Sequence, residues 1–200
     1  MPLKVGSTQN NSEYEMPPEG MQAGICIWVV NLGEHLNPRS QKYQPKVSLT
    51  FELPRCLMKD DRPFVISAQY TNSFYGSSIA KSHIGTWFNK RITDEASLSF
   101  DWFKLAGRHA TVQVQYSDDG RWANIAGLTP PNPADKDLAI YNDIITWTFG
   151  EGALPQSLPD WIKAKVMSSR EWNEQGQQNE GPKNIITVND QPVADEDLPF

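Results

Sequence analysis

The feature that most constrains the fold of this chain is a strict alternation of apolar and polar residues between positions 47 and 53. The apolar positions are Val47, Leu49, Phe51 and Leu53, and the polar ones are Ser48, Thr50 and Glu52. Successive side chains of a β-strand point to opposite faces. The pattern therefore predicts a strand with one face in a core and the other outside it.

Four further segments have the composition of strands: residues 25–30, 64–75, 110–116 and 122–128. The last two are joined by the turn sequence Asp118-Asp119-Gly120, which favours a hairpin. Between residues 76 and 107 the apolar period lengthens. It predicts a helix capped by Ser77 or Ser78 that ends near Lys90, then a shorter helix from Asp94 that stops at Gly107.

The predicted order is three strands, a helical insertion and two strands. Five strands with a helix between the third and fourth is the arrangement of the OB-fold, so we expect a mainly β chain with an OB-fold-like five-stranded barrel. The same number of strands also suits other small barrels. Six aromatic side chains are assigned to its core: Trp28, Phe51, Trp87, Phe88, Trp102 and Phe103.

The ends of the chain differ from this body. Residues 1–19 are polar and predict a flexible leader, and residues 20–150 hold the barrel, with 141–149 as one more strand or an extended segment lying across it. Residues 151–172 predict a helical extension that begins at Pro159 and Asp160, with Trp161, Ile162 and Val166 along one face. Residues 173–200 predict a disordered polar linker and an acidic tip.

The formal charge of −6 is unevenly distributed. Residues 20–125 contain twelve basic against nine acidic residues, a net +3, whereas residues 126–200 contain five basic against twelve acidic ones, a net −7. A mildly basic body followed by an acidic tail is typical of a domain that binds a polyanion and carries an interaction segment.

Binding of single-stranded nucleic acid needs aromatic faces on which bases stack, interleaved with cations that contact the phosphates. Three groups of residues supply both and are the predicted DNA-binding set. They are Arg39, Lys42, Tyr43 and Lys46; Tyr70, Phe74 and Tyr75; and Tyr116, Arg121 and Trp122. In an OB barrel these three regions are expected to converge on one face.

The end of the chain reads Asp195-Glu196-Asp197-Leu198-Pro199-Phe200. It resembles the C-terminal peptide of bacterial and phage single-stranded DNA-binding proteins, in which clustered acids precede an aliphatic residue, a proline and a final phenylalanine. The resemblance implies that the tip docks partner proteins of replication, recombination or repair. The chemistry agrees, because Phe200 offers an apolar anchor and Pro199 limits the entropy lost on docking.

Residues 18–131 resemble more loosely a group of phage single-stranded DNA-binding proteins. The resemblance rests on residues 25–32, on Phe51-Glu52-Leu53-Pro54, on Arg62-Pro63-Phe64 and on Asn124-Ile125, with Leu158-Pro159-Asp160-Trp161-Ile162 after the barrel. It implies sequence-independent binding of single-stranded DNA, without enzymatic activity, in a bacterial cytoplasm, that of the host if a phage encodes the chain. Assembly into a homo-oligomer is compatible with the sequence. Residues 141–172 are open to three roles: capping the barrel, forming a subunit contact or extending the groove.

Two alternatives stay open: an adaptor whose barrel binds protein instead of DNA, and a metal-dependent nuclease. His35, His83 and His109 have no partner at a catalytic motif spacing, and Asp60-Asp61 and Asp118-Asp119 are expected to be solvated turn acids. Cys26 and Cys56 stand alone and are expected to be buried hydrophobes. We therefore expect no catalytic residue, metal or cofactor. The longest apolar run, residues 25–30, is far shorter than the roughly 20 residues of a membrane span.

Overall fold

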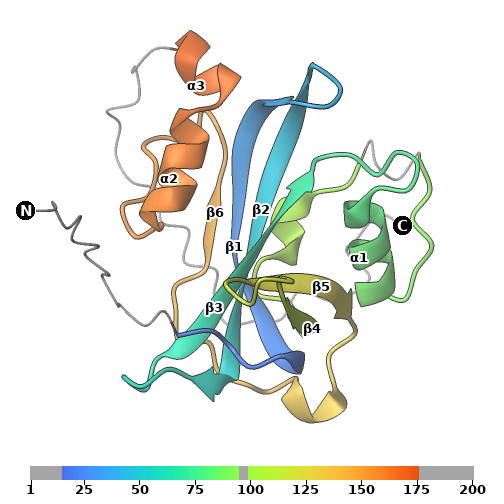
Figure 1. The fold of residues 1–200 in the computed structure, drawn as a ribbon, viewed down its shortest axis with the longest axis vertical. Coiled ribbons are helices and arrows are strands. Elements are labelled where there is room, and N and C mark those ends of the chain that lie inside the picture. Colours follow the sequence, from blue (N-terminus) through green and yellow to red (C-terminus); the bar gives the residue numbers. More distant parts are fainter. Residues whose placement is uncertain (1–14, 95–98, 176–200) are drawn as a thin grey trace, which may run out of the picture.

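The computed structural model describes residues 15–94 and 99–175, and Figure 1 shows their arrangement. Five antiparallel strands form one sheet in the order β3-β2-β1-β4-β5. Their bounds are β1 (Gly20–Asn37), β2 (Lys42–Leu57), β3 (Pro63–Thr71), β4 (His109–Tyr116) and β5 (Ala123–Thr129). The end strands β3 and β5 also contact each other, so the sheet curls round until its two ends meet. The prediction of a mainly β chain is confirmed.

The predicted alternation on β2 is confirmed by its burial. Val47, Leu49, Phe51 and Leu53 all face the inside of the curled sheet and are buried there. Helix α1 (Ile79–Trp87), joined in the chain between β3 and β4, closes this core with Ala80, Ile84 and Trp87. Ser78 caps α1, because its hydroxyl accepts a hydrogen bond from Lys81 N at 3.2 Å.

Among the aromatics assigned to the core, Trp28, Phe51, Trp87 and Trp102 are buried, whereas Phe88 and Phe103 pack partly buried against it. Cys26 and Cys56 are free and buried, as expected. Burial raises the pKa of the Cys26 thiol and, less strongly, that of Cys56.

A second core lies on the other face of β1. At the β-bulge between Cys26 and Trp28 the register shifts by one residue, which turns Ile27 and Trp28 toward this second core. There β6 (Ile145–Trp147) pairs in parallel with Trp28–Val30, and helix α2 (Asp160–Met167) packs Ile162 and Val166 against the strand. Of the roles open for residues 141–172, the structure shows a cap on the outer face of the sheet.

The connection into β6 is fixed to β2 by Glu52, one of the polar residues of the alternating strand. Its side chain is fully buried and accepts hydrogen bonds from Tyr141 N at 2.8 Å, Asn142 N at 2.8 Å and Asn142 Nδ2 at 2.6 Å. Neighbouring Ser48 and Thr50 are buried on the same face. The polar face of the predicted strand is therefore covered rather than exposed to solvent.

Three predicted elements differ from the structure. The strand predicted to run to residue 75 ends at Thr71, because Ser73 N donates to Thr71 O at 2.7 Å and turns the chain. Of the helix predicted from Asp94, residues 95–98 lie outside the described part, and the described residues hold a 3-10 turn, η2 (Trp102–Leu105), which starts where the Asp101 side chain accepts from Phe103 N at 3.0 Å. Helix α3 (Arg170–Gln175) continues past residue 172, where the linker is predicted to begin. A second short 3-10 turn, η3 (Pro133–Asp135), follows β5.

Candidate nucleic-acid interface

The β1–β2 hairpin projects beyond the rest of the sheet, at the top of Figure 1. Strand β4 pairs with β1 only as far as Ile25 and β6 only as far as Val30, so from Gly33 onward β1 pairs with β2 alone. We call residues 33–46 the arm. Its tip is a tight turn in which the Asn37 side chain accepts from Arg39 N at 2.9 Å, and Gln41 takes a φ of 53°.

The arm carries the first predicted group of binding residues. Tyr43 is 51 % exposed, and the guanidinium of Arg170 from α3 lies 5.3 Å from the centre of its ring. Arg39 and Lys42 are exposed on the same hairpin, and neither forms an ion pair with any residue that the structure describes. A half-exposed ring among cations is the arrangement that single-strand binding requires.

The base of the arm gathers further positive charge. Lys46 Nζ donates to Thr71 Oγ1 at 2.7 Å, which ties the arm to the end of β3. Burial and the nearby ammonium of Lys165 lower the pKa of Lys46. Burial also lowers the pKa of His35, against a hydrogen bond to the Leu32 carbonyl, and Lys165 adds to this lowering. The positive charge of Lys165 in α2 thus acts on both residues at the base of the arm.

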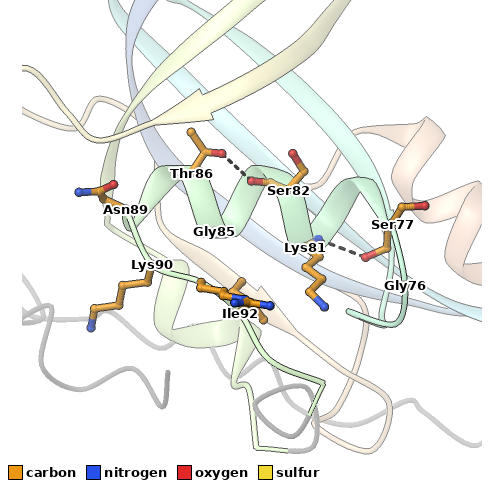
Figure 2. Close-up of a pocket in the computed structure, with 11 residues that line it drawn as sticks. Gly76, Ser77, Lys81, Ser82, Gly85, Thr86, Asn89, Lys90 and Ile92 are labelled. Carbon is orange, nitrogen blue, oxygen red and sulfur yellow. Dashed lines mark hydrogen bonds between the residues drawn. The ribbon is translucent and has the colours of Figure 1, made fainter.

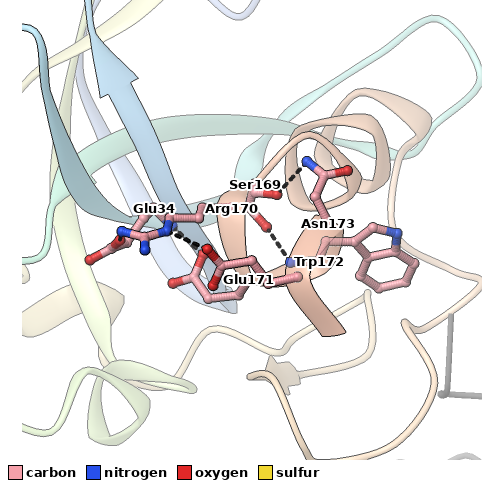
Figure 3. Close-up of polar contacts among 7 residues, drawn as sticks. Glu34, Ser169, Arg170, Glu171, Trp172 and Asn173 are labelled. Atoms are coloured by element: carbon pink, nitrogen blue, oxygen red, sulfur yellow. Dashed lines mark hydrogen bonds and ion pairs between the residues drawn. The ribbon is translucent and has the colours of Figure 1, made fainter. Parts of the chain in front are cut away.

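Helix α3 is held to the arm by polar contacts that Figure 3 shows. Glu34 N donates to Glu171 Oε2 at 2.7 Å, and the Arg170 guanidinium lies 3.5 Å from the Glu34 carboxylate and 2.6 Å from that of Glu174. This approach requires glycine at position 33, which has a φ of 79° and where a Cβ would lie 2.6 Å from Ser169 Cβ. Arg170 is thereby placed over Tyr43.

Lys165 and Arg170 complete the arm surface, yet neither is among the predicted binding residues. They reach it because α2 packs on the second core, which no local pattern indicates. A local signal exists for Lys165 alone, which follows half-exposed Trp161 by four residues, so that both lie on one face of α2. Trp161, predicted to share the face of Ile162 and Val166, turns instead toward solvent.

The second predicted group is only partly correct. Tyr70 and Phe74 are 3 % and 1 % exposed, so the prediction that bases stack on them is wrong. Tyr70 hydrogen-bonds through its hydroxyl to His83 Nδ1 at 3.0 Å, and burial raises the pKa of that hydroxyl. Phe74 packs on Trp102 with ring centres 5.4 Å apart. Both rings fill the space beneath α1 and η2, whereas Tyr75 points outward and is 72 % exposed.

The third group lies at the other end of β1. Tyr116 N donates to the Glu19 carboxylate at 2.7 Å and its hydroxyl to Pro17 O at 3.0 Å, so the β4–β5 hairpin sits beside the start of β1. Trp122 is 61 % exposed there, and Arg121 pairs with Asp119 at 2.7 Å. The structure does not gather this group with the arm into one cluster, because β4 pairs only with the first residues of β1.

The paired aspartates lie in turns, as expected. The Asp60 carboxylate pairs with Arg62 at 2.6 Å, and the arginine lowers the pKa of this exposed acid. Within residues 15–94 and 99–175, no three His, Cys, Asp or Glu side chains gather as a metal site, and no helix is long and apolar enough to cross a membrane. The tip predicted to dock partners, residues 195–200, lies outside the described residues.

No protein-family model matches this chain, and comparison with curated proteins and with solved structures gives no significant match either. The arm and the exposed aromatics are therefore the basis for a functional proposal.

Proposed function

We propose that this chain binds single-stranded DNA without sequence preference and has no enzymatic activity of its own. The observation that carries the proposal is the arm: half-exposed Tyr43 lies against Arg170 on a hairpin that projects from the body and also carries the exposed cations Arg39 and Lys42. Base stacking on aromatic rings tolerates any sequence, because every base has a π-face, while cations hold the backbone.

The strand arrangement supports an OB-type barrel as the scaffold. The order β3-β2-β1-β4-β5, contact between β3 and β5, and a helix joined between β3 and β4 are the features expected of that fold. OB domains bind oligonucleotides through the β2–β3 face and the β1–β2 and β4–β5 loops. In this chain Tyr43 lies on β2 just after the first of these connections and Trp122 lies in the second, and these are the exposed aromatics of the first and third predicted groups.

We assign the acidic tip a separate role. The barrel coats the single-stranded DNA. Residues 195–200 recruit partner proteins of replication, recombination or repair within a bacterial or phage-infected cytoplasm. The charge distribution supports this division, since the net +3 of residues 20–125 attracts phosphate while the acidic tail favours basic pockets on partner proteins.

Titration with oligo(dT), read by tryptophan fluorescence, tests the proposal. Trp122 and Trp161 are exposed, so a bound strand is expected to quench the emission, and binding should weaken with salt with a log–log slope of about −0.7 per neutralised phosphate. A protein-binding adaptor would give no quenching. A nuclease would degrade a labelled oligonucleotide when magnesium is added. Either result would overturn the proposal.

A further inference from the structure

A surface groove of about 800 Å³ runs along α1, on the face of the helix shown in Figure 2. Three cations line it: Lys81 from the helix, and Lys90 and Arg91 from the segment that follows. Hydroxyl and amide groups of Ser82, Thr86 and Asn89 complete the lining. The described lining residues include no aromatic or acidic side chain, but Lys81 Nζ forms an ion pair with the Asp94 carboxylate at 2.8 Å, so this cation is already partly neutralised.

The groove exists because the chain folds back along the helix after α1. Lys90 N donates to Gly85 O at 2.9 Å, Asn89 takes a φ of 51°, and Ile92 is buried as an anchor. Position 85 is glycine where a Cβ would lie only 3.0 Å from Lys90 O. The returning segment thereby brings Lys90 to the side of α1 that also carries Lys81, as Figure 2 shows.

The chemistry of the groove suits phosphates rather than bases. Cations and hydroxyls bind phosphate oxygens, whereas stacking needs a ring, which the described lining does not offer. The lining follows the whole of α1, from Gly76 before the helix to Asn89 after its end, with Lys90 and Arg91 on the segment that returns along it. Nine helical residues alone span roughly 13 Å at 1.5 Å per residue. That length exceeds one phosphate and suits successive phosphates of a polynucleotide.

The groove is also connected to the arm. Lys46 at the base of the arm donates a hydrogen bond to Thr71, and only four residues lie between Thr71 and Gly76 at the edge of the groove. This link spans at most about 18 Å when fully extended. Tyr75, the exposed member of the second predicted group, lies within it.

We propose that the α1 groove binds the phosphates of the same DNA strand that stacks on the arm, with Tyr75 between the two. The groove thus lengthens the binding track of the proposed function, on which this inference rests. A short oligonucleotide occupies the arm alone, and a longer one also engages Lys90 and Arg91.

The test compares two double variants that each remove two positive charges. Lys90→Gln with Arg91→Gln alters the groove, and Lys59→Gln with Arg62→Gln alters the β2–β3 loop, at the opposite end of β2 from the arm. Binding of labelled oligo(dT) is measured against salt at about 4 and about 16 nucleotides, the range that OB domains cover. Matching melting temperatures show that both variants fold.

For the longer strand, the groove variant is expected to weaken binding and to make the log–log salt slope less negative by about 1.4, which is two phosphates at 0.7 each. The shorter strand and the loop variant should match wild type. An equal loss of affinity at both oligonucleotide lengths, or an unchanged salt slope, would overturn the proposal that the groove binds phosphates. Wild-type protein that binds neither strand would overturn the proposed function itself. Ser82→Glu, which adds a negative charge to the exposed face of α1, should weaken binding of the longer strand only.

Discussion

Glu52→Gln tests how the capping segment is held on the barrel. Glu52 is fully buried and is the shared acceptor for three donors, the backbone N–H groups of Tyr141 and Asn142 and the Asn142 side-chain amide. A glutamine has the same shape but one acceptor oxygen. It can serve Tyr141 N or the two Asn142 donors, so at least one of these part-buried donors loses its partner.

An unsatisfied buried donor costs about 1–3 kcal/mol, and the bonds that remain weaken because the acceptor is no longer charged. Removal of a buried charge offsets part of this loss. We therefore expect the free energy of unfolding to fall by about 2 kcal/mol. For a chain of this size that corresponds to roughly 4–8 °C in Tm.

Thermal unfolding followed by circular dichroism measures the loss, and hydrogen exchange locates it. Amides of β6 should exchange faster in the variant, since the connection into β6 is released. Ser48→Ala is the matched control: Ser48 is equally buried on the same strand, and its hydroxyl has no hydrogen-bond partner among the described residues. It should leave Tm unchanged or raise it. Unfolding of Glu52→Gln at the wild-type temperature would refute the role assigned to Glu52.

Three further predictions concern the arm, the core and the tail. Gly76→Ala, at positive φ but with no atom within 4 Å of its Cβ, should cost only the backbone strain of about 1–2 kcal/mol and leave α3 docked. Gly33→Ala adds a clash with Ser169 to the same strain, so it should destabilise the protein by more than Gly76→Ala and release α3. Equal protease cleavage of α3 in both variants would contradict this. Burial lowers the pKa of His83 in the folded protein, although a hydrogen bond to Ala126 opposes this shift. Stability should therefore fall as pH drops through the ordinary histidine pKa near 6.5 and level off below the pKa of the folded protein. His83→Gln should flatten the dependence of the denaturant midpoint on pH across that window, and an unchanged dependence would contradict the role of His83. Deletion of residues 195–200 should abolish recruitment of partner proteins in a pull-down while DNA affinity stays equal or rises, and lost DNA binding would argue against the separate roles.

Much of the sheet is predictable from local pattern. The alternation at residues 47–53, the turn at Asp118–Gly120 and the cap at Ser78 each depend on near neighbours in the sequence, and the structure confirms all three. Burial is a weaker inference. A period of two identifies the two faces of β2, yet it does not show that Ser48 is buried or that Glu52 is contacted from outside by a segment almost ninety residues later.

The same limit explains the errors in the site. Tyr70 and Phe74 have the composition of a stacking surface, but their burial depends on where α1 and η2 pack. Conversely, Lys165 and Arg170 join the arm only because α2 docks on the second core. Long-range packing thus decides which aromatics and cations of a β-rich chain reach one surface.

The most direct measurement of the central claim is the dissociation constant for oligo(dT) of Tyr43→Ala beside that of Tyr141→Ala. Both tyrosines are largely exposed, but only Tyr43 lies on the arm. Stacking contributes about 1–3 kcal/mol per base, so loss of the Tyr43 ring should raise Kd by roughly 5- to 150-fold, with Tyr141→Ala close to wild type. Equal affinities for wild type and Tyr43→Ala would contradict the claim that DNA bases stack on the arm.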